Sequence, residues 1–453
     1  MNLSTLTAIS PLDGRYRGKV ESLAAWFSEY ALIRYRLLVE VEYFIALRAL
    51  DLPGHGPLSD ELTKRMRAFY EHFSEEDAMA VKTIEKRTNH DVKAVEYVLK
   101  DWIDRQGQPS YYKSREFVHF GLTSQDINNT ATPLMLRDAV HQAYLPQLDA
   151  ILTTLQQYAG KWKNIPMLAR THGQPASPTT LGKEIAVFAE RLQSQREELG
   201  GMHFPAKFGG ATGNFNAHYI AYPDVNWDAF GDHFVNEVLG LRRSRPTTQI
   251  EHYDGLARVF DCLRRINVIV TDLCQDVWLY ISQDYFKQKL KEGEVGSSAM
   301  PHKVNPIDFE NAEGNMGIST ALLEFLSRKL PVSRLQRDLT DSTILRNLGV
   351  ALGHSLLALN SLSKGLGKLV VNEARIAADL DGHWAVLAEA IQTILRRENF
   401  PNPYEALKAL TRGQEGINQQ SLQLFVDGLD VPARVKEELK ALRPETYVGN
   451  AGM

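Results

Sequence analysis

The sequence predicts an all-α protein whose centre is a bundle of long helices. Apolar residues recur at helical spacing over long stretches, and one stretch, 256–286, contains neither glycine nor proline. A helix of about 30 residues is roughly 45 Å long. Strand signals are few and scattered along the chain. Helices of this length need partners to cover their broad apolar stripes, and a bundle provides those partners.

Breaks between the periodic segments predict three domains. Residues 1–110 form a helical N-terminal domain that ends at a connection reading Q-G-Q-P-S. Residues 111–364 hold the longest periodic segments and form the predicted bundle. Residues 365–453 form a helical C-terminal domain, which F-P-N-P interrupts at 400–403. The organisation expected is therefore a central long-helix bundle with a smaller helical domain on each side of it in sequence.

Within the middle domain, four stretches carry apolar stripes at helical spacing. They are residues 148–158, 185–192, 256–281 and 345–359. Between the second and third lies 199–214, a long glycine-rich stretch that we expect to be a loop. The stripes are too broad for one partner each, which favours burial between several chains.

Composition bounds the possible partners. The 453 residues are 44% hydrophobic and 23% charged, with a formal net charge of −4, so there is no basic field to hold a nucleic acid. We find neither an export signal at the N-terminus nor an apolar run long enough to cross a bilayer. Cys262 and Cys274 form no metal or redox motif and are expected to be buried, inert thiols. We therefore expect a cytoplasmic protein that binds neither nucleic acid nor membrane.

One motif, G-S-S-A-M-P-H-K-V-N-P at 296–306, interrupts the helical pattern. Pro306 fits the first position of a following helix, so Ser297, Ser298 and Lys303 precede a helix N-terminus. Unpaired N–H groups and a partial positive charge make that location a natural anion site. A serine held there could act as a base once water is excluded. Taken alone, a surface loop with an ordinary helix cap is the commoner explanation.

Four further polar clusters weaken that simpler explanation. They read T-N-H-D-V-K-A-V-E (88–96), L-T-S-Q-D-I-N-N (122–129), R-T-H-G-Q-P-A (170–176) and S-R-L-Q-R-D-L-T-D-S-T-I-L-R (333–346). The third cluster places His172 in a turn of small residues after a helix. Each cluster also has an ordinary account: Thr123 or Ser124 as a helix N-cap, a surface histidine, or arginines on a solvated helix face. Together they are harder to dismiss.

Absent motifs narrow the chemistry further. The chain has no H-E-x-x-H, no repeated Cys/His spacing, no G-x-x-x-x-G-K-[ST] and no G-x-S-x-G. The glycines at 209, 210 and 213 follow no predicted strand, so a dinucleotide fold is unsupported. Serines beside a helix start, histidines, arginines and lysine remain. That set suits proton transfer on a polyanionic substrate better than acyl transfer or redox work.

The 296–306 motif resembles the mobile-loop signature of the fumarase/aspartase superfamily, close to G-S-S-x-M-P-x-K-x-N. The histidine before the lysine is similar to that of the adenylosuccinate lyase family, although 3-carboxymuconate cycloisomerases carry it as well. S-P-L-D-G-R-Y at 10–16, together with the clusters at 88–96, 170–176 and 337–347, also looks like the adenylosuccinate lyase family. The resemblance runs from about residue 8 to the C-terminus.

The resemblance implies a β-elimination in purine biosynthesis that releases fumarate. Its substrates would be adenylosuccinate, giving AMP, and succinylaminoimidazole carboxamide ribotide, giving AICAR. Alignment with the motifs makes Ser297 the base and His172 the acid, with Lys303 stabilising the extra negative charge. Spacing alone does not separate Ser297 from Ser298. A loop that closes over the serine would explain why glycine and small residues interrupt the helices.

The resemblance also implies the residues that bind substrate. They are Arg15, Tyr16, Asn89, His90, Asp91, Thr123, Ser124, Gln249, Lys303, Asn311, Arg337, Ser342, Thr343, Ile344, Leu345 and Arg346. Thr123, Ser124 and Gln249 would grip the succinyl part, with His90 and Asp91 nearby. The phosphate or a carboxylate would be bound by Arg15, Tyr16, Arg337, Ser342 and Arg346. Asn311 would support the nucleotide. The family further implies no metal or organic cofactor, and a homotetramer whose sites are shared between subunits.

Two alternatives stay open at this point. A sister lyase acting on another succinyl adduct or on a muconate would keep Ser297 and His172 and differ in the arginines that bind anions. A non-catalytic helical scaffold of the same fold would need none of these residues, and the intact serine, histidine and lysine set argues against it.

Overall fold

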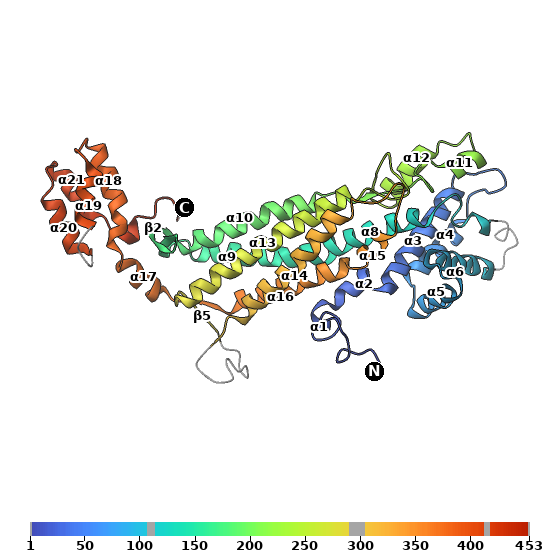
Figure 1. The fold of residues 1–453 in the computed structure, drawn as a ribbon, viewed down its shortest axis with the longest axis horizontal. Coiled ribbons are helices and arrows are strands. Elements are labelled where there is room, and N and C mark those ends of the chain that lie inside the picture. The colour runs from blue at the N-terminus through green and yellow to red at the C-terminus, as the bar shows by residue number, and fades with distance from the viewer. Residues whose placement is uncertain (1, 107–113, 290–303, 412–416, 452–453) are drawn as a thin grey trace. The chain divides into compact units, whose positions relative to one another are not determined.

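The structure is a computed structural model that describes residues 2–106, 114–289, 304–411 and 417–451. Helices dominate these ranges, and their strands form three two-stranded sheets (Figure 1). The predicted all-α class is confirmed. The chain groups into two compact units. The first comprises Met1–Leu148, Gln195–Val268 and Gly314–Asn360, and the second comprises Asp149–Ser194, Ile269–Glu313 and Ser361–Met453. The division into three domains drawn from the sequence remains a prediction.

The first unit begins with short helical turns followed by four longer helices. The turns are α1 (Arg17–Val20), η1 (Glu21–Leu23) and α2 (Ala24–Phe27), and the longer helices are α3 (Glu29–Arg48), α4 (Asp60–Glu71), α5 (Glu75–Thr88) and α6 (Asp91–Arg105). Serine side chains begin three of them. The hydroxyl oxygens of Ser28, Ser59 and Ser74 accept hydrogen bonds from N–H groups in the first turns of α3, α4 and α5.

In helix α8 (Ser124–Ala139), almost every residue from Gln125 to Leu136 is buried inside the first unit. A π-helical turn, η3 (Val140–Tyr144), joins it to α9 (Leu145–Lys161). Short elements of this unit also include η2 (Arg115–Phe117), β3 (Pro205–Ala206), α11 (Asn216–Ala221), α12 (Trp227–Asp232), η4 (His233–Val238) and β4 (Arg242–Arg243), with β3 and β4 paired in parallel.

The long helices lie side by side in Figure 1. They are α9, α10 (Leu181–Gly200), α13 (Asp254–Ser282), α14 (Ile307–Lys329) and α16 (Leu348–Lys368). The prediction of about 30 residues for α13 is confirmed by its 29 residues. Pro306 caps α14 rather than forming its first residue, because its carbonyl accepts from the N–H groups of Phe309 and Glu310. The stripe predicted over 345–359 is also divided, with its first residue ending α15 (Thr340–Leu345).

The second unit contains a hairpin that the sequence did not predict. Strands β1 (Pro166–Thr171) and β2 (Gln174–Thr180) pair antiparallel. A second small sheet pairs β5 (Phe286–Gln288) with β6 (Leu369–Val371). The C-terminal elements are α17 (Glu373–Asp381), η5 (Trp384–Leu387), α18 (Ala388–Arg397), α19 (Pro403–Thr411), α20 (Gln419–Asp427), α21 (Ala433–Ala441) and η6 (Pro444–Thr446). Leucines and valines of η5 and α18 to α21 share one apolar core.

Candidate active site

A cavity of about 580 Å³ lies within the first unit. Four segments that are distant in sequence form its walls: the start of α3, the α5–α6 turn, the first half of α8, and the segment that carries α15. The predicted site residues that line it are Asn89, His90, Asp91, Ser124, Arg337, Ser342, Thr343, Leu345 and Arg346. Three polar clusters recognised in the sequence, 88–96, 122–129 and 333–346, therefore meet around one cavity.

The α5–α6 turn holds its polar residues in fixed orientations. Asn89 adopts a left-handed backbone with φ 51°, so α6 can begin directly after α5. His90 is the N-cap of α6, and its Nδ1 accepts a hydrogen bond from the N–H of Lys93 at 3.1 Å. A neutral His90 therefore carries its proton on Nε2. The start of α6 therefore fixes which ring nitrogen of a neutral His90 can donate a hydrogen bond.

An ion pair between a buried arginine and a partly buried aspartate forms one wall of the cavity. The guanidinium of Arg36 lies 2.7 Å from the carboxylate of Asp91 and donates a second hydrogen bond, 2.8 Å long, to Asn128. Burial works to raise the pKa of Asp91, but the charge of Arg36 and a hydrogen bond from the Val92 N–H bring it below its ordinary value. Asp91 is thus held ionised beside Arg36.

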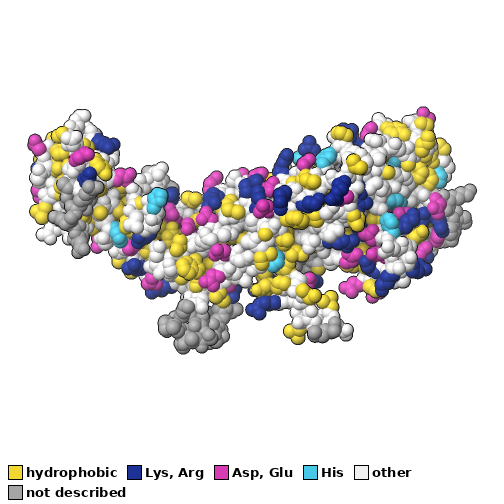
Figure 2. Space-filling model, in the orientation of Figure 1, with side chains coloured by type: hydrophobic (Ala, Val, Ile, Leu, Met, Phe, Trp, Pro, Cys, Tyr) yellow, Lys and Arg dark blue, Asp and Glu magenta, His cyan; other side chains and the backbone are white. Residues whose placement is uncertain are grey.

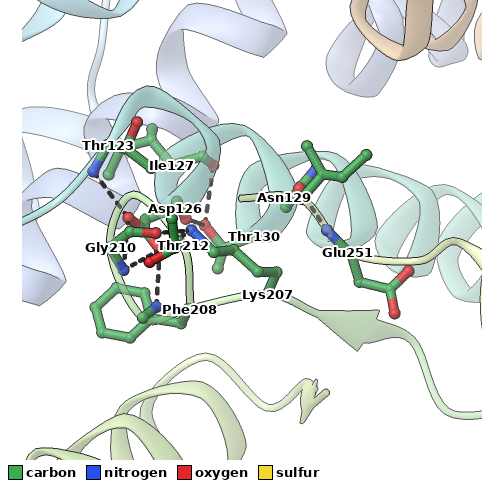
Figure 3. A network of polar contacts seen from close by, with 12 residues as sticks. Thr123, Asp126, Ile127, Asn129, Thr130, Lys207, Phe208, Gly210, Thr212 and Glu251 are labelled. Atoms are coloured by element: carbon green, nitrogen blue, oxygen red, sulfur yellow. Dashed lines mark hydrogen bonds and ion pairs between the residues drawn. The ribbon is translucent and has the colours of Figure 1, made fainter. Parts of the chain in front are cut away.

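The start of α8 is held by hydrogen bonds and an ion pair to a buried carboxylate. Asp126 is fully buried, and its carboxylate accepts from the N–H of Thr123 at 2.8 Å and from the N–H of Gly209 at 2.8 Å. The ammonium of Lys207, also fully buried, lies 2.8 Å from the same carboxylate (Figure 3). Buried charges of this kind persist only when they are paired and hydrogen-bonded. The network fixes the turn on which Ser124 faces the cavity.

The segment 337–346 brings two arginines to the cavity, and they differ in whether they contact a carboxylate. Arg346 lies 3.0 Å from the carboxylate of Glu29 and 3.6 Å from that of Asp91. Arg337 donates instead to the neutral hydroxyl of Ser342 at 3.1 Å. With the amide of Gln125 oriented so that its oxygen faces the guanidinium, Arg337 also donates to it from Nε at 3.2 Å.

Charge in the cavity favours an anionic ligand. Three guanidinium groups line it, against the carboxylates of Glu29 and Asp91. Among the described contacts, the charge of Arg337 meets no carboxylate, so it is the cation most available to a ligand. Planar guanidinium groups with adjacent hydroxyl and N–H donors suit phosphate and carboxylate. The arrangement can bind an anion and hold it in one orientation.

Some predicted residues of the first unit do not line this cavity. Thr123 is the N-cap of α8, which confirms that reading of the 122–129 cluster, and the side chain of Ile344 is packed in the core. Arg15 is exposed, and its guanidinium lies 5.8 Å from the centre of the Tyr16 ring. Gln249 is partly buried in the segment before α13.

The remaining predicted residues lie in the second unit or outside the described residues. Asn311 is on α14, where its side-chain oxygen accepts a 2.7 Å hydrogen bond from Ser361. His172 is exposed in the two-residue turn of the β1–β2 hairpin, not directly after a helix, and has φ 53°. The loop residues Ser297 and Lys303 lie outside the described residues.

The hairpin that carries His172 is anchored on its own unit. Arg170, two residues before His172, forms a 2.8 Å ion pair with Asp379 of α17. Burial works to raise the pKa of Asp379, but hydrogen bonds from Tyr285 and Arg170 lower it below its usual range. The carboxylate is therefore charged at neutral pH and holds β1 against α17.

Residues outside the predicted set of site residues also line the cavity. They include Ser28, Glu29, Arg36, Gln125, Asn128 and Thr132. Signals for two groups were present in the sequence. Gln125, Asn128 and Thr132 lie at helical spacing in and after the quoted cluster. Arg36 shares one face of α3, at helical spacing, with Leu32, Ile33 and Val39, and a charge buried on such a face needs a partner.

The described residues contain no group of three or more His, Cys, Asp or Glu side chains arranged to hold a metal ion. No helix among them has the length and apolar character needed to span a membrane.

Comparison with known proteins gives consistent matches along the whole chain. Residues 14–319 match the family model described as "Lyase", and residues 333–448 match the one described as "Adenylosuccinate lyase C-terminal". An adenylosuccinate lyase of Dictyostelium discoideum is 56% identical over 456 residues, covering 99% of this chain and 98% of that protein. The adenylosuccinate lyase of Escherichia coli K12 is 48% identical over 452 residues, covering 100% of this chain and 98% of that protein.

A solved structure shares the fold. The crystal structure of 3-carboxy-cis,cis-muconate lactonizing enzyme from Pseudomonas putida aligns with a TM-score of 0.73 and covers 95% of this chain and 94% of that one. Its sequence is 22% identical. The likeness shows a common architecture for the two chains.

Proposed function

The chain belongs to the adenylosuccinate lyase family of lyases, and we propose that it binds the anionic part of its substrate in the 580 Å³ cavity. Its reaction is the β-elimination of fumarate from adenylosuccinate, which leaves AMP. Succinylaminoimidazole carboxamide ribotide undergoes the same cleavage and leaves AICAR. The observation that carries the cavity's role is the convergence of Arg337, Ser342 and Arg346 with the turn of His90 around one space.

In the proposed mechanism, the base Ser297 removes a proton from the succinyl carbon next to a carboxylate. The electron pair left on that carbon is held as an aci-carboxylate near Lys303. The carbon–nitrogen bond then breaks, and the acid His172 supplies a proton to the departing nitrogen. One proton is taken and one returned, so the products are fumarate and the amino form of the nucleotide. Serine is a usable base only where water is excluded beside fixed positive charge.

In the cavity, Arg337 and Ser342 would bind the phosphate or a carboxylate by direct hydrogen bonds. Arg346 would join them when an incoming anion replaces Glu29, its partner at 3.0 Å. Thr123, Ser124 and Gln249 are assigned to the succinyl part. Support for the anion site is the neutral surroundings of Arg337, which leave its charge uncompensated among the described contacts.

We further propose a homotetramer with sites shared between subunits. Apolar side chains stay exposed on the long helices in the single chain. They include Val187 on α10, Val268, Trp278 and Leu279 on α13, and Ile307, Ile318 and Phe325 on α14. Figure 2 shows apolar side chains among charged ones at the surface along these helices. Exposed apolar stripes on long helices favour burial against further copies of the chain.

A cytoplasmic location is part of the same proposal. Cys262 and Cys274 are both buried and unbonded to each other, as expected from the sequence. Burial raises the pKa of the Cys262 thiol to about 11 and that of Cys274 to about 12, so neither is a reactive thiolate at neutral pH. Free thiols agree with a reducing compartment.

The function is tested by incubating the purified protein with adenylosuccinate. Fumarate and AMP should appear in equal amounts, at the rate at which adenylosuccinate disappears. A muconate or another succinyl adduct, supplied separately, should be left unchanged. Turnover of one of those compounds in place of adenylosuccinate would indicate a sister lyase, and release of fumarate from no succinyl nucleotide would indicate a scaffold.

A further inference from the structure

Tyr253 joins two walls of the cavity without lining it. It lies directly before α13 and is 1% exposed. Its hydroxyl accepts a 2.7 Å hydrogen bond from the amide of Asn129, on α8. The same hydroxyl donates a 2.8 Å hydrogen bond to the carboxylate of Asp341, on α15. A single buried oxygen thus ties α8 to the helix that presents Ser342.

Beyond Tyr253, a chain of hydrogen bonds returns to α8. Asp341 accepts from the N–H of Ser342 at 2.7 Å. The hydroxyl of Ser342 accepts from Arg337 at 3.1 Å, and Arg337 donates in turn to Gln125. Gln125 and Asn129 are four residues apart on one face of α8. The connection therefore forms a ring that begins and ends on α8 and includes the available guanidinium.

The backbone of Tyr253 is held in an unusual conformation to reach this position. Its φ is 63°, a value that is rare for a bulky residue and persists only where surrounding contacts enforce it. Two contacts do so. The amide oxygen of Asn129 accepts from the N–H of Glu251 at 2.9 Å, and the carboxylate of Glu251 accepts from the N–H of Tyr253. The side chain of Asn129 therefore forms hydrogen bonds with both ends of the 251–253 segment, at Glu251 and at Tyr253.

We propose that Tyr253 is a positioning residue that holds Arg337 and Ser342 ready for the substrate's anionic group. Its hydroxyl keeps Asp341, and with it the start of α15, in register with α8 before substrate arrives. Groups held in place in advance lose less freedom on binding, so affinity rises. The inference rests on the proposed function, which assigns Arg337 and Ser342 to that anion.

Replacing the hydroxyl alone provides the test. In Tyr253→Phe, Asn129 and Asp341 each lose a buried partner, so the α15 segment gains freedom. The KM for adenylosuccinate should rise about tenfold, equivalent to about 1.4 kcal/mol. The kcat should stay close to the wild-type value, because Tyr253 takes no part in breaking bonds. The dissociation constant of AMP, measured by titration calorimetry, should rise by a similar factor.

Tyr144→Phe is the matched control. Tyr144 is also 1% exposed, but its hydroxyl has no hydrogen-bond partner among the described residues. The KM of the Tyr144→Phe variant for adenylosuccinate and its affinity for AMP should equal those of the wild type. If Tyr253→Phe does not fold by circular dichroism, Asp341→Asn weakens the same link with little change of shape and should raise KM in the same direction.

An unchanged KM, or a fall in kcat at constant KM, overturns the positioning role. AMP binding separates that failure from failure of the proposed function. Should the wild-type protein release no fumarate, the function is wrong, and the AMP titration alone then decides the role of Tyr253. Equal AMP affinity in wild type and Tyr253→Phe, or no AMP binding by either protein, overturns the inference.

Discussion

At the scale of single residues, the three arginines that line the cavity differ in the partners that their guanidinium groups contact. Arg36 is buried and fully engaged with Asp91 and Asn128, so its role is to shape the wall. Arg346 is half exposed and shares its charge with Glu29. Arg337 meets neutral groups. An incoming anion therefore finds one guanidinium available at once and a second one that it gains by displacing a carboxylate.

The sharpest residue prediction concerns the base. Ser297→Ala should lower kcat by about 10²- to 10⁴-fold, the usual contribution of a positioned acid or base. Its neighbour Ser298 provides the matched control, because it is the same residue type at the next position and only Ser297 is assigned to proton transfer. Ser298→Ala should keep most of the activity. Fumarate release, followed by absorbance, measures both variants, and the reverse pattern would move the base to Ser298.

A second residue prediction concerns pH and His119. The imidazole Nδ1 lies 2.6 Å from Glu40, and Nε2 lies 3.8 Å from Glu96. Burial works to lower the pKa of His119, but Glu40 and then Glu96 raise it above its ordinary 6.5. Protonated His119 therefore stabilises the folded state fully below pH 6.5, and this stability is lost as pH rises through the raised pKa.

The corresponding variant is His119→Gln, which cannot titrate. The melting temperature of the wild type should fall more steeply than that of the variant as pH rises above 6.5, through the raised pKa of His119. Differential scanning calorimetry at a series of pH values measures the difference. Parallel curves for the two proteins would mean that His119 does not gain protons on folding.

Motif residues of the cavity could be predicted from the sequence, whereas their partners could not. His90, Asp91, Arg337 and Arg346 stand in short clusters of polar residues. Arg36 is separated from Asp91 by 55 positions, and only the folded chain shows that the two are 2.7 Å apart. Tyr253 is equally hidden, because a lone tyrosine before a helix carries no sign of its two distant partners.

At the scale of elements, periodicity predicted the long helices well and the hairpin not at all. Helix α13 has 29 residues and the expected buried stripe, because a long apolar pattern without glycine or proline leaves little alternative. Strands β1 and β2 contain prolines and few β-branched residues, so they lack the usual strand signals. The turn signal was His172–Gly173, where both residues have positive φ, as a tight hairpin requires.

The start of helix α8 is held by the buried ion pair between Asp126 and Lys207, and this pair gives a prediction about stability. Asp126→Asn leaves the buried ammonium of Lys207 without a countercharge and should lower the free energy of unfolding by about 3–5 kcal/mol. In Asp126→Asn/Lys207→Met, both charges are removed, so part of that loss should be recovered. Urea unfolding followed by circular dichroism measures both. A single variant as stable as the wild type would show that the pair contributes little.

At the scale of the whole molecule, the apolar stripes on α10, α13 and α14 make a prediction about assembly. Sedimentation velocity should give one species of about four chains at the concentrations used for assays. Replacing two exposed stripe residues, as in Ile318→Lys/Phe325→Lys, should shift the protein to smaller species and reduce activity, because shared sites are lost with the contacts. A stable and fully active monomer would contradict the proposed tetramer.

The central claim is that the cavity lined by Arg36, Arg337 and Arg346 binds the anionic part of the nucleotide. A crystal structure of the protein with bound AMP tests it most directly. The account predicts the phosphate within hydrogen-bond distance of the Arg337 guanidinium and the Ser342 hydroxyl, with Arg346 turned from Glu29 toward the ligand. AMP bound elsewhere, with Arg337 still hydrogen-bonded only to Ser342 and Gln125, would contradict it.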